Sequence, residues 1–307
     1  MNEVEVRNLL KDLGKEMATI KDEAERTAKI AALTEMHRNY LGEDKVVSSH
    51  ELLDAIKKRP EVIKINSGIK KLDDVLGGFV KKQLIALSGI TKHGKTSFAI
   101  ELTCQMKDRQ PLFLPFEEPA EEIIQKFLDR GEEVPLFFTP EKMVRNTKSC
   151  LEWIEKKIIE SKAKYGTEVV FIDQLSFIVP FGVERYDLVI QEAMHQLKEI
   201  AKRWDVLIFI LCHLKKIKID VNPDLEDLKD SASIAQVADT VILLWRKTER
   251  VNGEVVIGNE TTVSVQANRR TGKTGNIKLV FDKGRFYEPS PIHQTHDAEL
   301  ESWTDFE

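Results

Sequence analysis

Two stretches of the sequence carry a Gly-Lys-Thr triplet at a spacing that could bind phosphate groups. Residues 89–97 read GITKHGKTS; the run before them, QLIALSG, is typical of a buried strand, and the run after them, SFAIELTCQM, of a helix. A loop between a strand and a helix can direct backbone N–H groups at phosphates, while Lys95 reaches the β- and γ-phosphates and the Thr96 hydroxyl binds Mg²⁺. We therefore predict that a nucleotide with β- and γ-phosphates binds here together with Mg²⁺. The predicted contacts are Gly89, His93, Gly94, Lys95, Thr96 and Ser97.

The second copy, ANRRTGKTG at 267–275, stands in a different context. The run that follows it, NIKLVF, is typical of a strand, which offers no helix N-terminus to hold a phosphate. This stretch is therefore predicted to be a hairpin connection rather than a second nucleotide site. The residues of this stretch that could take part in chemistry are instead Arg269 and Arg270, just before the turn.

Polar side chains also stand at the ends of three other apolar runs. Asp173 ends VVFID, where a carboxylate at the C-terminal edge of a parallel sheet can hold the Mg²⁺ shell together with Thr96. Glu117 and Glu118 end PLFLPFEE, and either carboxylate could orient a hydrolytic water. His213 ends VLIFILCH at the same kind of edge, where it could sense the γ-phosphate. Plainer alternatives remain open: a capping Asp, a solvated Glu and a hydrogen-bonded structural His.

The elements that must position these residues predict an α/β fold. The runs QLIALSG, PLFLPFEE, EVVFIDQLSFIV, VLIFILCH and TVILLWR are nearly continuous in apolar residues, as in a parallel sheet covered on both faces. Amphipathic stretches such as DLVIQEAMHQLKEIAKRW separate them and predict the covering helices. Near the end, TTVSVQANRR and GNIKLVFDKGRFYEP alternate instead, which indicates an antiparallel hairpin at the sheet edge.

Four regions are predicted along the chain. Residues 1–47 carry an amphipathic helical pattern, and residues 48–62 a linker helix that Ser48 and Glu51 open as a capping box. Residues 63–290 form the α/β domain. Residues 291–307 form a disordered acidic tail, whose five acidic residues, without any Lys or Arg, equal the whole net charge of −5.

Composition narrows the class of protein and its location. No apolar run approaches the ~20 residues that cross a bilayer, and the opening residues lack a signal-peptide core. Three cysteines without metal spacing fit a reducing compartment. We therefore expect a soluble cytoplasmic protein with no membrane partner. Because the net charge lies in the tail, it does not exclude a nucleic-acid partner, which needs only a local basic surface.

Several stretches resemble motifs of the DnaB-like replicative DNA helicases and follow one another in the same order along the chain. They are GITKHGKT, PFEEPAEE, FIDQLSFIV, ILCHLKK, DLKDSASIAQVADTVILLWR and RRTGKTGNIKLVFDKGRFYEPS, and the DQLS and CHLK forms are similar to the helicase half of phage primase-helicases and of the mitochondrial Twinkle helicase. The resemblance implies a RecA-like ATPase that forms a ring, usually a homo-hexamer, on single-stranded DNA. It also implies a bacterial or phage-infected cell as the setting.

The resemblance implies a role for each matching residue of the ATP site. Lys95 and Thr96 contact phosphate and Mg²⁺, Asp173 is the Walker B acid, Glu117 is the catalytic carboxylate and His213 is the sensor.

The resemblance also implies DNA contacts and an arginine finger. The DNA-contacting loop matches LKDSAS, which makes Lys229, Asp230 and Ser231 the implied phosphate contacts. The finger that reaches a neighbouring subunit's ATP matches Arg269 or Arg270. In a strand, neighbouring side chains point to opposite faces, so only one of the two arginines is expected to cross the interface.

An alternative function comes from a different class. A recombinase-like or clock-type relative, similar to RecA, RadA or KaiC, would assemble on DNA or protein without unwinding, and SGIKKLDDVLGG suits it equally well. The stretch DSASIAQVADTVILLW and the terminal hairpin favour the helicase.

Other replication proteins are expected as partners. Residues 1–60 are short and lack paired cysteines, so a separate primase is expected to supply priming. The tail carries Trp303 and Phe306 among its acids and could dock on that primase, a loader or a DNA polymerase; a plain solvating tail is the other interpretation.

Overall fold

The computed structural model describes residues 46–58, 61–131, 133–143, 150–179, 185–214, 222–227, 231–252 and 254–289. Contacts divide the chain into two compact units, Met1–Glu61 and Val62–Glu307. The predicted N-terminal helical segment, apart from its last two residues, and the predicted acidic tail lie outside the described residues. In the described ranges, no helix is long and apolar enough to cross a membrane.

The described part of the first unit is built around helix α3, Ser49–Lys57. The Ser48 hydroxyl accepts a hydrogen bond from the Glu51 N–H at 3.2 Å, and the Glu51 carboxylate accepts one from the Ser48 N–H at 2.7 Å. This reciprocal arrangement satisfies two N–H groups that a helix start leaves without helical partners. The capping box predicted from the sequence is therefore confirmed.

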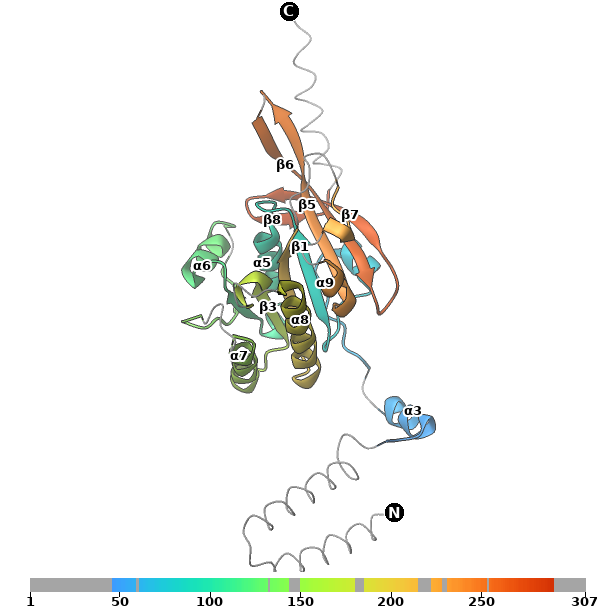
Figure 1. Cartoon of the computed structure of the whole chain (residues 1–307). Helices are drawn as coiled ribbons and strands as arrows, with labels where there is room; N and C mark the ends of the chain where they lie inside the picture. The colour runs from blue at the N-terminus through green and yellow to red at the C-terminus, as the bar shows by residue number, and fades with distance from the viewer. Residues whose placement is uncertain are drawn as a thin grey trace, which may run out of the picture. The chain divides into compact units, whose positions relative to one another are not determined.

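The second unit alternates strands and helices along the chain (Figure 1). Its strands are β1 (Leu84–Gly89), β2 (Leu112–Pro115), β3 (Val169–Asp173), β4 (Leu207–His213), β5 (Thr240–Val251), β6 (Glu254–Asn268), β7 (Gly275–Asp282) and β8 (Arg285–Tyr287). Its α-helices are α4 (Lys70–Leu76), α5 (Lys95–Gln105), α6 (Ala120–Leu128), α7 (Cys150–Tyr165), α8 (Tyr186–Arg203) and α9 (Ser231–Val237).

The central sheet confirms the α/β prediction. It is 8-stranded, in the order β2-β3-β4-β1-β5-β6-β7-β8. Strands β2, β3, β4, β1 and β5 pair in parallel. Because parallel strands end at the same edge of a sheet, residues that follow them along the chain converge there.

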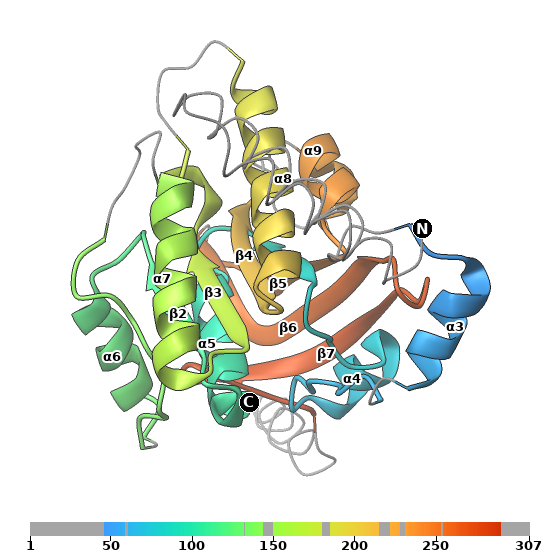
Figure 2. The ribbon, with the colours of Figure 1, turned by 90° about the horizontal axis from the view of Figure 1, so that it is seen from below.

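Helices cover both faces of this sheet (Figure 2). Helices α7, α8 and α9 pack on the face that carries Leu84 and Ala86 of β1. Helices α4, α5 and α6 pack on the opposite face, which carries Ile85 and Leu87. The alternation of side chains along a strand divides the core in this way, and it explains why the parallel strands are apolar at nearly every position.

The antiparallel part of the sheet is larger than the predicted hairpin. Strand β6 pairs antiparallel with β5, β7 with β6, and β8 with β7. The outer ends of β5 and β6 project beyond the rest of the unit as a long ribbon (Figure 1). Residues 269–274 join β6 to β7, so the second Gly-Lys-Thr lies in a hairpin connection, as predicted.

A buried ion pair fastens helix α5 to the end of this antiparallel part. The Arg130 guanidinium donates to the Glu101 carboxylate at 2.8 Å, and the two side chains are 2% and 5% exposed. Arg130 also donates to the Gly284 carbonyl at 3.0 Å, and the same Glu101 oxygen accepts from the Phe286 N–H at 3.4 Å. One ion pair therefore connects α5, the end of α6 and the β7–β8 turn.

Substitution of Arg130 by methionine is expected to lower the free energy of unfolding by about 3–5 kcal/mol, because it leaves the Glu101 carboxylate buried without its cation. Urea denaturation followed by circular dichroism measures this change. The double variant Glu101→Leu/Arg130→Met should regain part of the loss, since it removes both charges. Lys164→Met, at the exposed pair with Glu160, is the control and should leave the midpoint unchanged. An unchanged midpoint in Arg130→Met would contradict the prediction.

Candidate active site

The first Gly-Lys-Thr stretch forms the loop between β1 and α5, as its sequence context predicts. Strand β1 ends at Gly89, and helix α5 begins at Lys95. Gly94 has a φ of 97°, a conformation that favours glycine. At Gly89, a Cβ would lie 2.2 Å from the Leu244 carbonyl oxygen, so no larger residue fits. The loop therefore brings the N-terminus of α5, with its free N–H groups, to the C-terminal edge of the sheet.

The Lys95 side chain is buried at the base of this loop. It is 7% exposed, and its Nζ donates to the Gly89 carbonyl at 3.2 Å. Burial lowers the pKa of Lys95, while the charges of Asp173 and Glu117 oppose that change. A buried ammonium group beside carboxylates is well placed to take a phosphate oxygen as a further partner.

Thr96 and Asp173 meet directly. The Thr96 hydroxyl donates to Asp173 Oδ2 at 2.7 Å, across the 77 positions that separate them in the sequence. Burial raises the pKa of Asp173 to about 6, and the hydrogen bond from Thr96 opposes that change. The other carboxylate oxygen, Oδ1, is buried and has no hydrogen-bond partner among the described residues.

This pair fits the residues that Mg²⁺ uses beside a nucleotide. Mg²⁺ takes one or two protein oxygens, phosphate oxygens and water, and rarely a full protein cage. In keeping with this, the described residues contain no group of three or more His, Cys, Asp or Glu that could hold a metal by itself. Asp173 Oδ1 and the Thr96 hydroxyl are the oxygens that the site offers.

Glu117 and Glu118 differ in their surroundings. Both follow β2 instead of ending it, and the Glu117 N–H donates to the Asp173 carbonyl at 3.0 Å, which brings Glu117 beside the Thr96–Asp173 pair. The Glu118 carboxylate forms an ion pair with Lys126 of α6. Glu117 is exposed, and its charge acts on both Lys95 and Asp173. The geometry therefore favours Glu117 as the carboxylate that can meet a substrate.

His213 lies at the same edge of the sheet. It ends β4 and is paired in register with Gly89, the last residue of β1. Gln174 was not singled out by its sequence pattern, although it follows Asp173 directly. It is 3% exposed, and its amide oxygen is buried without a hydrogen-bond partner in the ranges that the structure describes. Its place after a strand end was the signal that could have identified it.

Two other predicted contacts have different surroundings. The imidazole of His93 is 4% exposed and accepts a hydrogen bond from the backbone of Arg246 at 2.9 Å, so it is engaged within the fold. Ser97 is half-buried and lines a cavity of about 260 Å³ with residues of α5, α6 and the β7–β8 turn. Neither side chain has a hydrogen bond to Lys95, Thr96 or Asp173 among the described contacts.

The expectation that strand alternation separates Arg269 from Arg270 is wrong, because β6 ends at Asn268 and both arginines lie in the turn. Their side chains nevertheless diverge. Arg269 donates to the carbonyls of Ala238, at 3.0 Å, and Gln236, which lie at the end of α9. Neither arginine forms a hydrogen bond with residues 89–97 of its own chain.

Arg270 is directed to the other side of the turn. Its guanidinium donates to the carbonyls of Leu76 and Gly77, each at 2.9 Å, and to that of Gly78. These carbonyls lie at the C-terminal end of α4. The last carbonyls of a helix receive no hydrogen bond from within the helix. Arg270 therefore caps a helix of its own domain.

A guanidinium and an aromatic ring stack beside the phosphate loop. The Arg246 guanidinium carbon lies 4.3 Å from the centre of the Phe281 ring. A Cβ at Gly94 would lie 3.8 Å from the same ring, so Phe281 backs the loop directly. Both residues lie on the antiparallel strands, and no spacing in the sequence links them to residues 89–97. They were missed for that reason.

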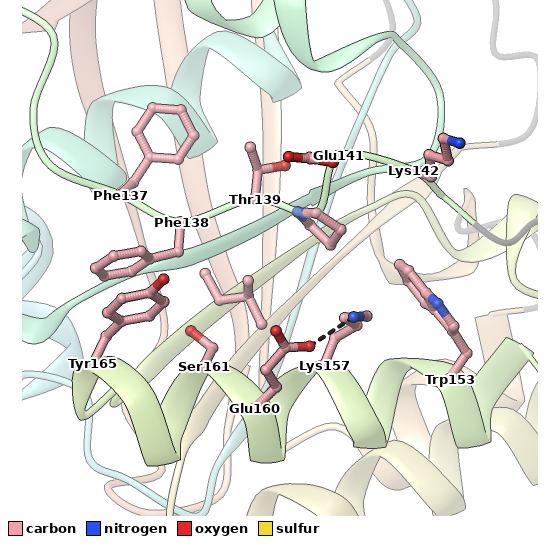
Figure 3. Close-up of a pocket in the computed structure, with 12 residues that line it drawn as sticks. Phe137, Phe138, Thr139, Glu141, Lys142, Trp153, Lys157, Glu160, Ser161 and Tyr165 are labelled. Carbon is pink, nitrogen blue, oxygen red and sulfur yellow. Dashed lines mark hydrogen bonds and ion pairs between the residues drawn. The ribbon is translucent and has the colours of Figure 1, made fainter.

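A separate groove of about 770 Å³ lies between α7 and residues 137–142 (Figure 3). Aromatic side chains line it, including Phe138 and Tyr165, whose rings are stacked with centres 3.8 Å apart. None of the predicted site residues lines this groove. It is therefore distinct from the edge of the sheet at which Lys95 and Asp173 meet.

The predicted DNA contacts cannot be placed in the fold. Lys229 and Asp230 lie outside the described residues, and Ser231 is described only as the first residue of α9. The backbone places the start of α9 directly after them.

Comparison with known proteins identifies relatives of this arrangement. The family model of the DnaB-like helicase C-terminal domain matches residues 64–148 and 141–287. The replicative DNA helicase DnaB of Rickettsia prowazekii is 28% identical over 286 residues, covering 74% of this chain and 58% of that protein. The DnaB helicase of Pasteurella multocida is 25% identical over 326 residues, covering 89% of this chain and 66% of that protein. The chain thus spans less than two thirds of either relative.

Solved structures share the fold. A DnaB-like replicative helicase, studied with its interactions with primase, has a TM-score of 0.65 at 18% identity, covering 94% of this chain and 78% of that chain. A second solved structure, of an ATPase domain, has a TM-score of 0.65 at 20% identity, covering 80% of this chain and 100% of that chain. A KaiC-like protein of Pyrococcus horikoshii has a TM-score of 0.56 at 17% identity, covering 75% of this chain and 100% of that chain.

Proposed function

We propose that this chain, which belongs to the DnaB-like helicase C-terminal domain family, is an ATP-driven motor of a replicative DNA helicase. The observation that carries the proposal is the convergence at one edge of the sheet. The phosphate loop after β1, Asp173 of β3, Glu117 after β2 and His213 of β4 all lie there. This arrangement suits the hydrolysis of a nucleoside triphosphate.

The residues divide the work of hydrolysis between them. The backbone of the loop and Lys95 hold the β- and γ-phosphates, and the Lys95 charge stabilises the negative charge that develops on the transferring group. Thr96 and Asp173 would hold Mg²⁺, which neutralises phosphate charge when it is bound. Glu117 orients a water whose oxygen attacks the γ-phosphorus while the bond to the bridging oxygen breaks and ADP leaves.

His213 is suited to report the state of the γ-phosphate. It stands on β4 beside Gly89, so loss of the γ-phosphate would change the surroundings of both strand ends. The stacked Arg246 and Phe281 offer a flat surface beside the loop on which a nucleotide base could lie.

The proposal includes a homo-hexameric ring on single-stranded DNA. Lys229, Asp230 and Ser231 would contact DNA phosphates, and an arginine of one subunit would reach the ATP of the next. Both arginines donate to carbonyls at a helix end of their own domain, Arg269 to two and Arg270 to three among the described contacts, so the proposed finger is Arg269, the less engaged of the two. The carbonyls that accept from Arg269 lie at the end of α9, the helix that follows the proposed DNA contacts.

A second candidate function rests on fold alone, which the chain shares with the KaiC-like protein at a TM-score of 0.56. A motor of this fold could assemble on DNA or protein and hydrolyse ATP without unwinding. The family model that matches residues 64–148 and 141–287 is that of helicases, which makes unwinding the first hypothesis. We also propose that a primase, a loader or a DNA polymerase is a partner of this chain. The proposed location is the cytoplasm.

A forked duplex with a labelled strand tests the proposal. The full chain with ATP and Mg²⁺ should displace that strand, and ADP should not support displacement. Binding to single-stranded DNA should be sequence-tolerant and should weaken by about tenfold or more between 50 and 200 mM salt, because the proposed contacts face phosphates. ATP hydrolysis that DNA stimulates, without any strand displacement, would favour the second function. Binding that ignores ionic strength would contradict the phosphate contacts.

A further inference from the structure

The phosphate loop is held to the sheet by a hydrogen bond that its sequence pattern does not require. Nδ1 of His93 accepts from the backbone N–H of Arg246 at 2.9 Å, across 153 positions of the sequence. Because Nδ1 accepts, the neutral imidazole carries its proton on Nε2. Burial, aided by the Arg246 charge, lowers the pKa of His93 to about 4, so the ring stays neutral at physiological pH.

On either side of His93, the backbone of the loop has positive φ angles. Lys92 has a φ of 67° and Gly94 a φ of 97°, both in the left-handed region. For a lysine this conformation costs free energy, and it persists only where the surrounding structure holds it. His93 stands between these two residues, and its side chain is the buried part of the loop that reaches β5.

The donor residue is itself firmly placed. The Arg246 guanidinium donates to the Gly258 carbonyl at 2.7 Å and lies over the Phe281 ring. Strand β5 therefore presents a fixed N–H to His93. Because this donor is a backbone group, no substitution at position 246 except proline removes it, and proline would also disturb β5. The hydrogen bond is therefore tested from the His93 side.

We propose that His93 is a positioning residue, which keeps the phosphate loop in its nucleotide-binding conformation through the hydrogen bond to the Arg246 backbone. The inference rests on the proposed function, since it concerns the same nucleotide site. In this role, His93 holds the conformation of the phosphate loop and does not itself contact the phosphate. Without this hydrogen bond, the free loop relaxes, and nucleotide binding must restore its conformation. The apparent affinity is then the intrinsic affinity multiplied by the fraction of molecules that retain the competent loop.

A pair of amide substitutions separates the hydrogen bond from the general effect of a mutation. In His93→Asn, the side-chain oxygen can stand where Nδ1 stands, whereas in His93→Gln it lies farther out, where Nε2 stands. His93→Leu removes the acceptor altogether. Mg–ADP affinity is measured by calorimetry, and kcat and KM for ATP by steady-state hydrolysis, on the full chain.

We expect the Kd for Mg–ADP and the KM for ATP to rise about tenfold in His93→Gln and His93→Leu, a change of about 1.4 kcal/mol, because a buried donor that loses its partner is costly. In His93→Asn both constants should stay within about threefold of wild type, and in all three variants kcat should change far less than KM. The control is Ser161→Ala on α7, which loses a buried hydrogen bond to Thr167, a residue that follows this helix. It should lower the melting temperature without changing the Kd.

The outcomes separate this inference from the proposed function. A wild-type chain that does not bind Mg–ADP contradicts the proposed function. A wild type that binds, with equal Kd values in His93→Asn and His93→Gln, overturns the positioning role alone. If His93→Leu does not fold, the amide pair still decides, because both amides are polar and differ in the place of their oxygen.

Discussion

Lys95→Ala is expected to lower steady-state ATP turnover by at least about 10²–10³-fold, because it removes the cation that stabilises the transferring phosphate. Lys95 is 7% exposed, and its ammonium group lies at the base of the phosphate loop beside Asp173. No other described cation occupies that place. Release of inorganic phosphate, measured with and without single-stranded DNA, quantifies the loss.

Lys95→Met keeps most of the buried side-chain length and removes only the charge, so it is the packing control for Lys95→Ala. Both variants should show a wild-type circular dichroism spectrum and lose turnover to a similar extent. If Lys95→Met retained normal turnover, the assignment of the phosphate loop would be wrong. If only Lys95→Ala lost activity and its melting temperature fell steeply, packing rather than charge would explain the loss.

Arg269→Ala is expected to lower turnover by roughly 10³-fold while nucleotide binding is retained, since arginine fingers of this kind act on the transition state in a neighbouring active site. Arg270→Ala should have a much smaller effect on turnover. Both substitutions should lower the melting temperature, because Arg269 donates to carbonyls at the end of α9 and Arg270 to carbonyls at the end of α4. Mg–ADP binding, ATP hydrolysis and thermal unfolding measured on both variants distinguish the two roles.

Mixing two inactive variants tests whether the site is shared between subunits. A ring that contains Lys95→Ala and Arg269→Ala subunits has some interfaces that pair an intact phosphate loop with an intact arginine. Those interfaces should restore part of the ATPase activity. Mixed assembly is verified beforehand with differently tagged chains. The absence of rescue in rings shown to be mixed would exclude the shared site, and the arginines would then serve only the turn.

Local pattern predicted the elements that carry the proposed chemistry. The order of strand, loop and helix around Lys95 is visible in the sequence because apolar periodicity distinguishes a buried strand from an amphipathic helix. The same reasoning separated the second Gly-Lys-Thr, at the β6–β7 connection, from the first. Asp173 and His213 were identified because they end apolar runs, and parallel strands end at one edge of a sheet.

Surroundings that depend on distant segments were not predicted. Local pattern alone does not separate Glu117 from Glu118, whereas in the fold the Glu117 N–H donates to the Asp173 carbonyl and Glu118 forms an ion pair with Lys126. Arg269 and Arg270 are neighbours, but one reaches the end of α9 and the other the end of α4. The extent of the antiparallel part was underestimated as well, because alternation shows that strands exist and does not show how many share an edge.

The sequence by itself determined the fold class, the phosphate loop and the polar residues at the strand ends, since each depends on spacing within a single element. Only the tertiary structure decided what each side chain meets. The sequence predicted that His93 contacts the nucleotide. In the structure its imidazole accepts a hydrogen bond from the Arg246 backbone of β5, 153 positions away in the chain. Such a contact leaves no periodic trace, because it depends on the packing of elements that are far apart in the sequence.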